Sequence, residues 1–384
     1  MDKRKVPRNS DMPIEKLVLN DTKKIGHHFE SISIDKYKCF NNFSIDSFKR
    51  VNLIGGKNNV GKSSFLEAFF LLMGATNINL LLNINAFRGI EVYEGKPEII
   101  REMLWNHLFN AYSSDRNISI VGEIENRRYI NLVISSAQID QIYTSINGSI
   151  LQNGLISTGK INDQTLQFKY KDENGKKYIV EMKVENKGIS IPPPSVSSPY
   201  RGIFVPSNRR LIWPDIASRY GQLELSNNEF DLVSALTIIE PRLKKLSTIM
   251  GASGPMIYGD IGVGRMLPLA EMGDGLMNLM DKLLAITTVP HGVVLMDEVE
   301  NGFHYSILDK VWKIFDQVSQ KYDVQIIATT HSWECIKSAH NNFITDNYYD
   351  FSYHRLEKFD DNIVAISLTQ DTLQTTIDSG WEIR

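Results

Sequence analysis

Residues 55–64 have the composition of a phosphate-binding loop, with three glycines, two lysines, two asparagines, two serines and one valine. They follow an apolar run at 51–54 and precede a helical pattern at 65–72, so strand, loop and helix occur in the required order. Glycines let backbone N–H groups approach phosphate oxygens, and a helix N-terminus attracts anions. This order disfavours an ordinary turn before a core helix. The candidate nucleotide-binding residues are Gly56, Lys57, Asn58, Asn59, Gly61, Lys62, Ser63 and Ser64.

Two of these residues have distinct chemistry. The ammonium group of Lys62 is expected to reach the β- and γ-phosphates of ATP, and the hydroxyl of Ser63 is expected to ligate Mg²⁺.

A second motif is the apolar run 293–296, which is followed by two adjacent carboxylates, Asp297 and Glu298. Adjacent residues on a strand point in opposite directions, so we expect Asp297 to bind magnesium and Glu298 to act as general base. The alternative is a surface acidic pair.

Two further motifs are weaker. The predicted strand 324–329 ends before His331, which could sense the γ-phosphate or the attacking water, although Ser332 could simply cap a helix there. Residues 269–276 form a glycine-flanked turn before an amphipathic helix at 276–286. This turn is equally consistent with a plain helix cap and with a phosphate contact. Its candidate residues are Gly273, Asp274 and Gly275.

The composition describes a chain with ample core material and no general affinity for nucleic acid. The 384 residues are 42% hydrophobic, and the formal net charge is -3. Cys39 and Cys335 are far apart, and no apolar run is long enough to cross a bilayer. We therefore expect a cytoplasmic location and no membrane partner.

The pattern along the chain predicts an α/β fold with a mixed central sheet. We expect a flexible extension at 1–27, a first core part at 28–75, an inserted β-rich and helical region at 76–264, and a second core part at 265–384. Within the insertion, an Asn-Gly turn at 174–175 predicts a hairpin, and residues 191–199 should return the chain to the core. A capping box at 226–229 predicts one long helix to about residue 250, with a possible bend at Pro241.

Taken together, these motifs resemble ABC-type ATPases related to the structural-maintenance and RecF proteins. They resemble most closely the ATPase class shared with the overcoming-lysogenization-defect nucleases. Residues 32–40 and 51–64 are similar to that family's first strands and Walker A loop, and 297–304 to its Walker B segment. His331 is similar to its switch histidine and 271–275 to its divergent signature, with Ala270 where serine is common. The resemblance covers 29–75 and 265–340.

The resemblance implies an ATPase with ATP and Mg²⁺ as cofactors and a homodimer or higher homo-oligomer that shares its ATP sites. Nucleases of this class carry a long C-terminal acidic domain, for which we expect no room after His331. The tail acids look like solvated turns rather than a two-metal site, so we expect this chain not to be a nuclease. They are Asp346, Asp350, Asp360 and Asp361.

The resemblance further implies a sensor or regulatory subunit of a bacterial antiphage defence complex, as in PARIS-type or Septu systems, with a separate effector such as a nuclease. The alternative is a RecF-like ATPase that binds DNA in repair or recombination. Its candidate DNA contacts are basic residues of the predicted insertion, Arg201, Arg209, Arg210, Arg219, Arg242, Lys244 and Lys245. Such charges are more often a solvated face.

Overall fold

The computed structural model describes residues 28–90, 96–110, 117–140, 162–185, 188–191, 200–207, 213–251, 254–344 and 349–380. The predicted extension at 1–27, all of the predicted return segment 191–199 after its first residue, Arg209, Arg210 and Asp346 lie outside these residues. Among the described residues, no helix combines the length and the apolarity needed to cross a membrane.

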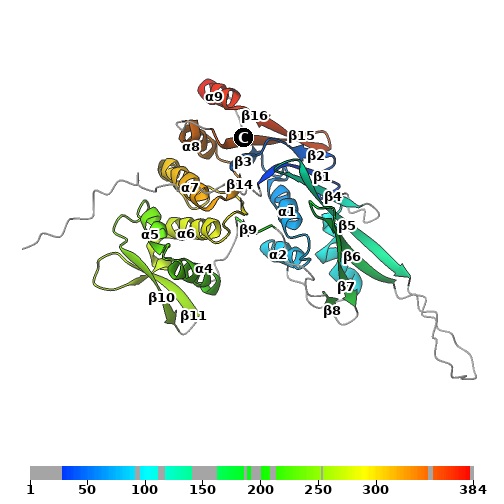
Figure 1. Cartoon of the computed structure of the whole chain (residues 1–384), viewed down its shortest axis with the longest axis horizontal. Helices are drawn as coiled ribbons and strands as arrows, with labels where there is room; N and C mark the ends of the chain where they lie inside the picture. Colours follow the sequence, from blue (N-terminus) through cyan, green and yellow to red (C-terminus); the bar gives the residue numbers. More distant parts are fainter. Residues whose placement is uncertain are drawn as a thin grey trace, which may run out of the picture.

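A six-stranded sheet forms the centre of the molecule (Figure 1). Its strand order is β16-β15-β3-β14-β13-β9, and all neighbours are parallel except β15 and β16. The predicted mixed central sheet is therefore confirmed. The strands are β3 (Val51–Gly56), β9 (Gly202–Val205), β13 (Val293–Met296), β14 (Gln325–Thr329), β15 (Phe351–Phe359) and β16 (Asn362–Leu368).

Both faces of the sheet are buried at the central strands β3, β13 and β14, in which every residue is buried. Val293 and Leu295 belong to the core on the side of α1 (Lys62–Met73), whereas Val294 and Met296 belong to the core on the opposite side. Figure 1 shows α1, from the first core part, on one side of the sheet and the helices of the second core part on the other side. These are α6 (Asp274–Thr287), α7 (Leu308–Tyr322), α8 (Trp333–Ile344) and α9 (Gln370–Ser379), with the 3-10 helix η5 (Tyr305–Ile307) before α7.

A seven-stranded antiparallel sheet covers the other side of α1, in the order β2-β1-β4-β5-β6-β7-β8. The predicted Asn-Gly hairpin is confirmed: β6 and β7 pair up to Lys171 and Lys177, and Gly175 has φ +82°. The strands are β1 (Phe29–Asp35), β2 (Phe43–Ile45), β4 (Ile118–Ile124), β5 (Arg128–Asp140), β6 (Asn162–Lys171), β7 (Lys177–Glu185) and β8 (Gly188–Ser190). The connection from α1 to β4 contains α2 (Leu80–Phe87), α3 (Pro97–Leu104) and η2 (Asn106–Leu108).

The predicted long helix from 226 to about 250 is wrong. The chain forms α4 (Trp213–Leu225), then α5 (Glu229–Leu236), and then a hairpin of β10 (Lys245–Gly251) and β11 (Gly254–Asp260). Asn227 has φ +54°, which separates the two helices, and Ser226 Oγ donates back to carbonyls of α4 rather than capping α5. Pro241 cannot donate a helical hydrogen bond, so α5 ends before it. The strand β12 (Leu267–Pro268) and the 3-10 helix η4 (Leu269–Met272) then lead to α6.

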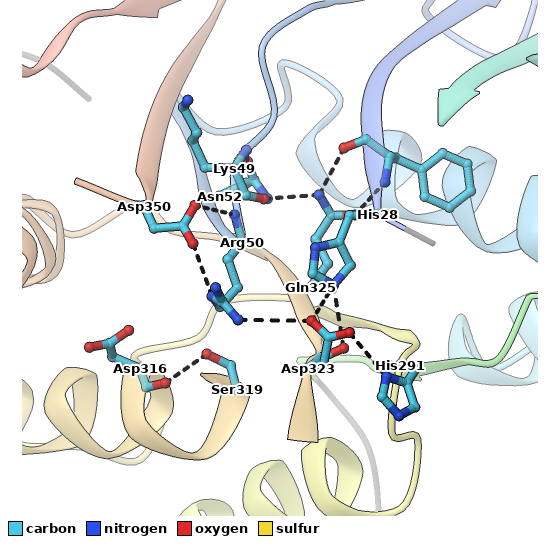
Figure 2. Close-up of polar contacts among 11 residues, drawn as sticks. His28, Lys49, Arg50, Asn52, His291, Asp316, Ser319, Asp323, Gln325 and Asp350 are labelled. Carbon is cyan, nitrogen blue, oxygen red and sulfur yellow. Dashed lines mark hydrogen bonds and ion pairs between the residues drawn. The ribbon is translucent and has the colours of Figure 1, made fainter. Parts of the chain in front are cut away.

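A polar cluster lies at the amino-terminal ends of the parallel strands β3, β14 and β15, whereas the predicted phosphate loop follows the carboxyl end of β3 (Figure 2). Arg50 donates to Asp350, before β15, at 3.0 Å and lies 4.0 Å from Asp323, before β14. Gln325 donates to the carbonyl oxygens of Phe29 and Lys49. These contacts set the register of β3 against its neighbours, and thereby the height at which the loop after β3 leaves the sheet.

Candidate nucleotide-binding and hydrolysis site

The loop after β3 closes tightly around its own helix start. Gly56 and Gly61 have φ angles of +137° and +93°, which side chains rarely allow. A Cβ atom on Gly61 would lie 2.7 Å from Cys39 Sγ, so no other residue fits there without displacement. Asn59 also has a positive φ, which asparagine tolerates. Lys57, Asn58 and Asn59 at the loop tip are exposed, and Gly61, Ser63 and Ser64 are half-buried.

Lys62 is buried, and its ammonium group is held inside the loop. It donates to the carbonyl oxygens of Gly56 at 2.6 Å and Lys57 at 2.9 Å. Burial lowers its pKa, although three carboxylates, Asp297 first among them, act to raise it. The lysine therefore lies in a partly dehydrated loop beside negative charge, a position from which it can exchange carbonyl oxygens for phosphate oxygens.

Asp297 directly follows β13, and its carboxylate accepts hydrogen bonds from hydroxyl groups of three other segments. Its Oδ2 accepts from Ser63 Oγ at 2.8 Å and from Ser207 Oγ at 3.3 Å, and its Oδ1 accepts from Thr329 Oγ1 at 2.6 Å. The structure thus brings together Ser63 and Asp297, the two predicted metal ligands. One carboxylate surrounded by hydroxyls is a set of hard oxygen donors, which suits Mg²⁺.

The side chain of Glu298 contacts Asn301 and His331 rather than the hydroxyls around Asp297. Its backbone has φ +48°, and its N–H donates to Thr329 Oγ1 at 2.8 Å. Its side chain is 38% exposed, and Oε2 accepts from Asn301 Nδ2 at 2.7 Å. Oε1 lies 3.8 Å from His331 Nδ1. The strained backbone therefore directs Glu298 toward His331 and solvent, on a different side from Asp297, where a carboxylate can meet water.

His331 lies at the end of the segment that follows β14, with its side chain 48% exposed. Its backbone N–H donates to Glu300 Oε1 at 3.0 Å, and its ring Nδ1 lies 3.3 Å from the same oxygen. Four residues without a predicted role also belong to this region: Thr329, Asn301, Glu300 and Ser207. All four touch predicted site residues, and three of them lie within the motifs that drew attention to the site.

Gly273, Asp274 and Gly275 form the start of α6. Gly273 is the N-cap, with φ +99° and no side-chain capping bond, and a Cβ atom placed there would meet nothing within 4 Å. Among the described residues, no hydrogen bond or ion pair joins this turn to the loop 55–64. The turn is an open backbone surface within one chain.

A cavity of about 340 Å³ adjoins the Ser63–Asp297 pair. The buried Glu67 lines this cavity and accepts hydrogen bonds from two cationic side chains. Arg88 donates to both of its carboxylate oxygens, at 2.6 Å and 3.0 Å, and Lys38 also donates to Glu67. No sequence motif predicts this cluster, because its members come from α1, the end of α2 and the turn after β1. The lining residues are Ser63, Glu67, Phe87, Arg88, Phe204, Pro206, Ser207 and Asp297.

Comparisons with known proteins give a family. Residues 51–334 match the family described as AAA domain, putative AbiEii toxin, Type IV TA system. A Helicobacter pylori protein named ATP/GTP phosphatase is 25% identical over 334 residues, which cover 80% of this chain and 86% of that protein.

Solved structures with a related arrangement include SMC heads. The SmcHead bound to the C-winged helix domain of ScpA aligns over 91% of this chain and 99% of that one, with 12% identity and a TM-score of 0.48. The SMC head domain from Thermotoga maritima aligns over 89% of this chain and 99% of that domain, with 11% identity and a TM-score of 0.41. Since the family match spans most of the chain, including the loop, the acidic pair and the histidine, this protein belongs to that AAA family and is an ATPase domain of the AAA type.

Proposed function

We propose that this chain hydrolyses ATP at the site built from Lys62, Ser63, Asp297, Glu298 and His331. The observation that carries the proposal is the 2.8 Å contact between Ser63 and Asp297, which joins the phosphate loop to the acidic strand end across 234 residues of sequence. An ordinary turn and a surface acidic pair would not be expected to contact each other. The name of the Helicobacter pylori relative, ATP/GTP phosphatase, supports the same activity.

Mg²⁺ would be held by Ser63 and Asp297, with the hydroxyl of Ser207 adjacent. When bound, the ion would neutralise charge on the β- and γ-phosphates. The protein itself supplies the other parts: backbone N–H groups after Gly56 and the start of α1 face the phosphates, and Lys62 moves from carbonyl oxygens to phosphate oxygens. Thr329 holds Asp297 and the backbone of Glu298 in one arrangement.

Glu298 is our candidate general base. Its exposed carboxylate can accept a proton from water, and Asn301 restricts its rotamer through one oxygen. His331 lies beside it, with Nδ1 toward carboxylates, so that its other ring nitrogen is available for a phosphate oxygen or the attacking water.

Two variants separate binding from chemistry. Lys62→Ala should greatly weaken ATP binding, because it removes the cation in the loop. Glu298→Gln should leave ATP affinity near that of the wild type and lower kcat by about 100-fold or more. Equilibrium binding of ATP and phosphate release, measured on both variants, test this. Wild-type turnover in Glu298→Gln would exclude it as the base.

We further propose that two copies of the chain share each ATP site. The start of α6 is an open glycine turn without a side-chain cap, and it makes no hydrogen bond to the phosphate loop of its own chain among the described residues. It can therefore present N–H groups to a nucleotide held by a second copy.

Complementation tests the shared site. Gly273→Trp and Lys62→Ala should each abolish turnover, and their mixture should recover activity because the mixed dimer contains one site with both parts intact. A mixture that forms mixed dimers but stays inactive, or a monomer with full turnover, would refute sharing. Mixing each variant with itself is the control.

At the level of the cell, we propose a sensor or regulatory subunit of a bacterial antiphage defence complex whose effector is a separate protein. Support comes from the motif resemblance and from the family description, which names a toxin of a toxin–antitoxin system. Loss of protection against phage in cells that carry Lys62→Ala, with the partner genes intact, would be expected. The purified chain should hydrolyse ATP without cutting DNA.

The alternative is DNA binding in repair or recombination. It has less support, because Arg219 is paired with Asp215 and Arg242 with Glu240, whereas Lys244 and Lys245 are exposed. A salt-dependent shift of duplex DNA by the purified chain, lost in a Lys244→Ala/Lys245→Ala variant, would favour it.

A further inference from the structure

Glu300 is a nearly buried carboxylate in the turn that follows β13. Its side chain is 10% exposed, and its backbone carbonyl accepts from the N–H of Phe303 at 3.0 Å. Asn301, the next residue, has its own N–H bonded to the carbonyl of Glu298. The turn therefore holds Glu300 rigidly, three positions after Asp297. A buried carboxylate is costly unless hydrogen bonds or an opposite charge compensate it.

One oxygen of Glu300 makes two contacts with His331. Oε1 accepts from the backbone N–H of His331 at 3.0 Å and lies 3.3 Å from ring Nδ1. The competing carboxylate, Glu298, lies farther from the same ring atom, at 3.8 Å. Because a carboxylate oxygen can only accept a hydrogen bond, its negative charge at this distance favours the tautomer of His331 that carries a hydrogen on Nδ1. The imidazole is then fixed in orientation, and Nε2 is left for the reaction.

The other oxygen of Glu300 faces the protein interior. Oε2 is buried, and the buried thiol of Cys335 on α8 is the polar group that interacts with Glu300 there: burial raises the pKa of this thiol, and the carboxylate raises it further. A buried cation, Lys282 of α6, is 5% exposed and interacts electrostatically first with its neighbour Asp281 and then with Glu300, although no ion pair within 4.0 Å joins it to Glu300 among the described residues. Its ammonium lies 5.0 Å from the centre of the Phe303 ring, in the same turn as Glu300. The helix that begins at Gly273 is thus connected to the turn that orients His331.

We propose that Glu300 is a positioning residue for ATP hydrolysis: it holds His331 in one tautomer and orientation, and Lys282 balances its charge from α6. This proposal rests on the proposed ATPase function. It differs from a purely structural role for the Glu300–Lys282 pair in one measurable respect. If Glu300 acts through His331, its removal has no kinetic effect once the imidazole is absent.

The test is a kinetic double-mutant cycle. Glu300→Leu/Lys282→Met removes both buried charges together, which preserves the fold better than removing one. We expect it to bind ATP normally and to lower kcat by about 10- to 100-fold, the range typical of groups that orient a catalytic side chain, with little change in KM. In a His331→Ala background the same two substitutions should lower kcat no further.

Two more variants complete the design. Glu300→Gln keeps an acceptor for Nδ1–H and should give a kcat between those of the wild type and the paired variant. Glu334→Gln, on the exposed first turn of α8 and bonded to Ser332, removes a nearby charge that does not touch the imidazole and should leave kcat unchanged. Thermal unfolding and ATP binding are measured for all variants. If the paired variant does not fold, the cycle is run with Glu300→Gln.

The outcomes are distinct. Absence of ATP hydrolysis by the wild type would refute the proposed function. Hydrolysis by the wild type together with an unchanged kcat in the Glu300 variants would refute the positioning role, as would losses that multiply in the His331→Ala background.

Discussion

Thr329→Val isolates the hydroxyl that joins the two acidic residues to the neighbouring strand. Valine has nearly the same shape, and Thr329 is fully buried, so packing is preserved. The substitution removes the hydrogen bond to Asp297 Oδ1 and the acceptor for the Glu298 N–H. Loss of a hydrogen bond to a charged group costs about 1.5–3 kcal/mol, and a buried N–H left unpaired costs about 1–3 kcal/mol. We expect the free energy of unfolding to fall by about 3–5 kcal/mol.

Thr329→Ser is the matched control, because it keeps the hydroxyl and loses one methyl group, at a cost of about 1 kcal/mol. Urea unfolding gives both values, and phosphate release under saturating ATP gives kcat. We expect the valine variant to lose most of its kcat, since Asp297 and Glu298 lose their common anchor, and the serine variant to retain most of it. Equal destabilisation by valine and serine, or full turnover in the valine variant, would refute this account of the site.

Two further predictions concern stability and loop geometry. Burial lowers the pKa of His354 to about 4, and this ring lies between the hydroxyls of Ser352 and Ser367. The unfolded chain protonates this histidine near its usual pKa of about 6.5, so the folded state should lose on the order of 3 kcal/mol as the pH falls from about 6.5 to 4. Urea unfolding across this range should show a shallower pH slope in His354→Gln, and an identical slope would exclude His354 as its cause. Gly61→Ala should weaken both folding and ATP binding, because its Cβ would meet Cys39 Sγ at 2.7 Å. In Gly273→Ala the Cβ meets nothing within 4 Å, so the loss of stability should come from backbone strain alone, about 1–3 kcal/mol at φ +99° and ψ 152°, and should be smaller than in Gly61→Ala, while turnover falls through the partner's site; an equal or greater loss of stability in Gly273→Ala would contradict this contrast.

The sequence predicted the parts of the site that lie on regular strands followed by glycine or acidic residues. The run 293–296 is apolar at every position, and this alone indicates a strand buried on both faces with Asp297 at its end. The same pattern predicted β14 and the position of His331 after it. The strand predictions use only neighbours in the chain, and β13 and β14 confirm them, whereas the roles of the residues that follow these strands stay predictions.

Other features depend on partners that the sequence does not bring together. Glu300 was part of a recognised motif, but its role follows from its distance to His331, which depends on β13 and β14 being neighbours. Between 226 and 250, the capping pattern at Ser226 competed with the strand propensity of 246–249, and pairing with β11 decided the outcome. Sequence reasoning gave too much weight to the local capping pattern there.

The contacts of Asp297 have a consequence for how the protein reaches its active form. Its three hydroxyl partners lie 234, 90 and 32 residues away in the sequence, and one of them, Ser207, follows β9, the edge strand of the central sheet. Such distant contacts pay loop-closure entropy before they contribute energy, so they form late in folding. A partly folded chain could contain the phosphate loop and its helix without the arrangement needed for hydrolysis. During refolding, recovery of turnover should therefore lag behind recovery of helical signal.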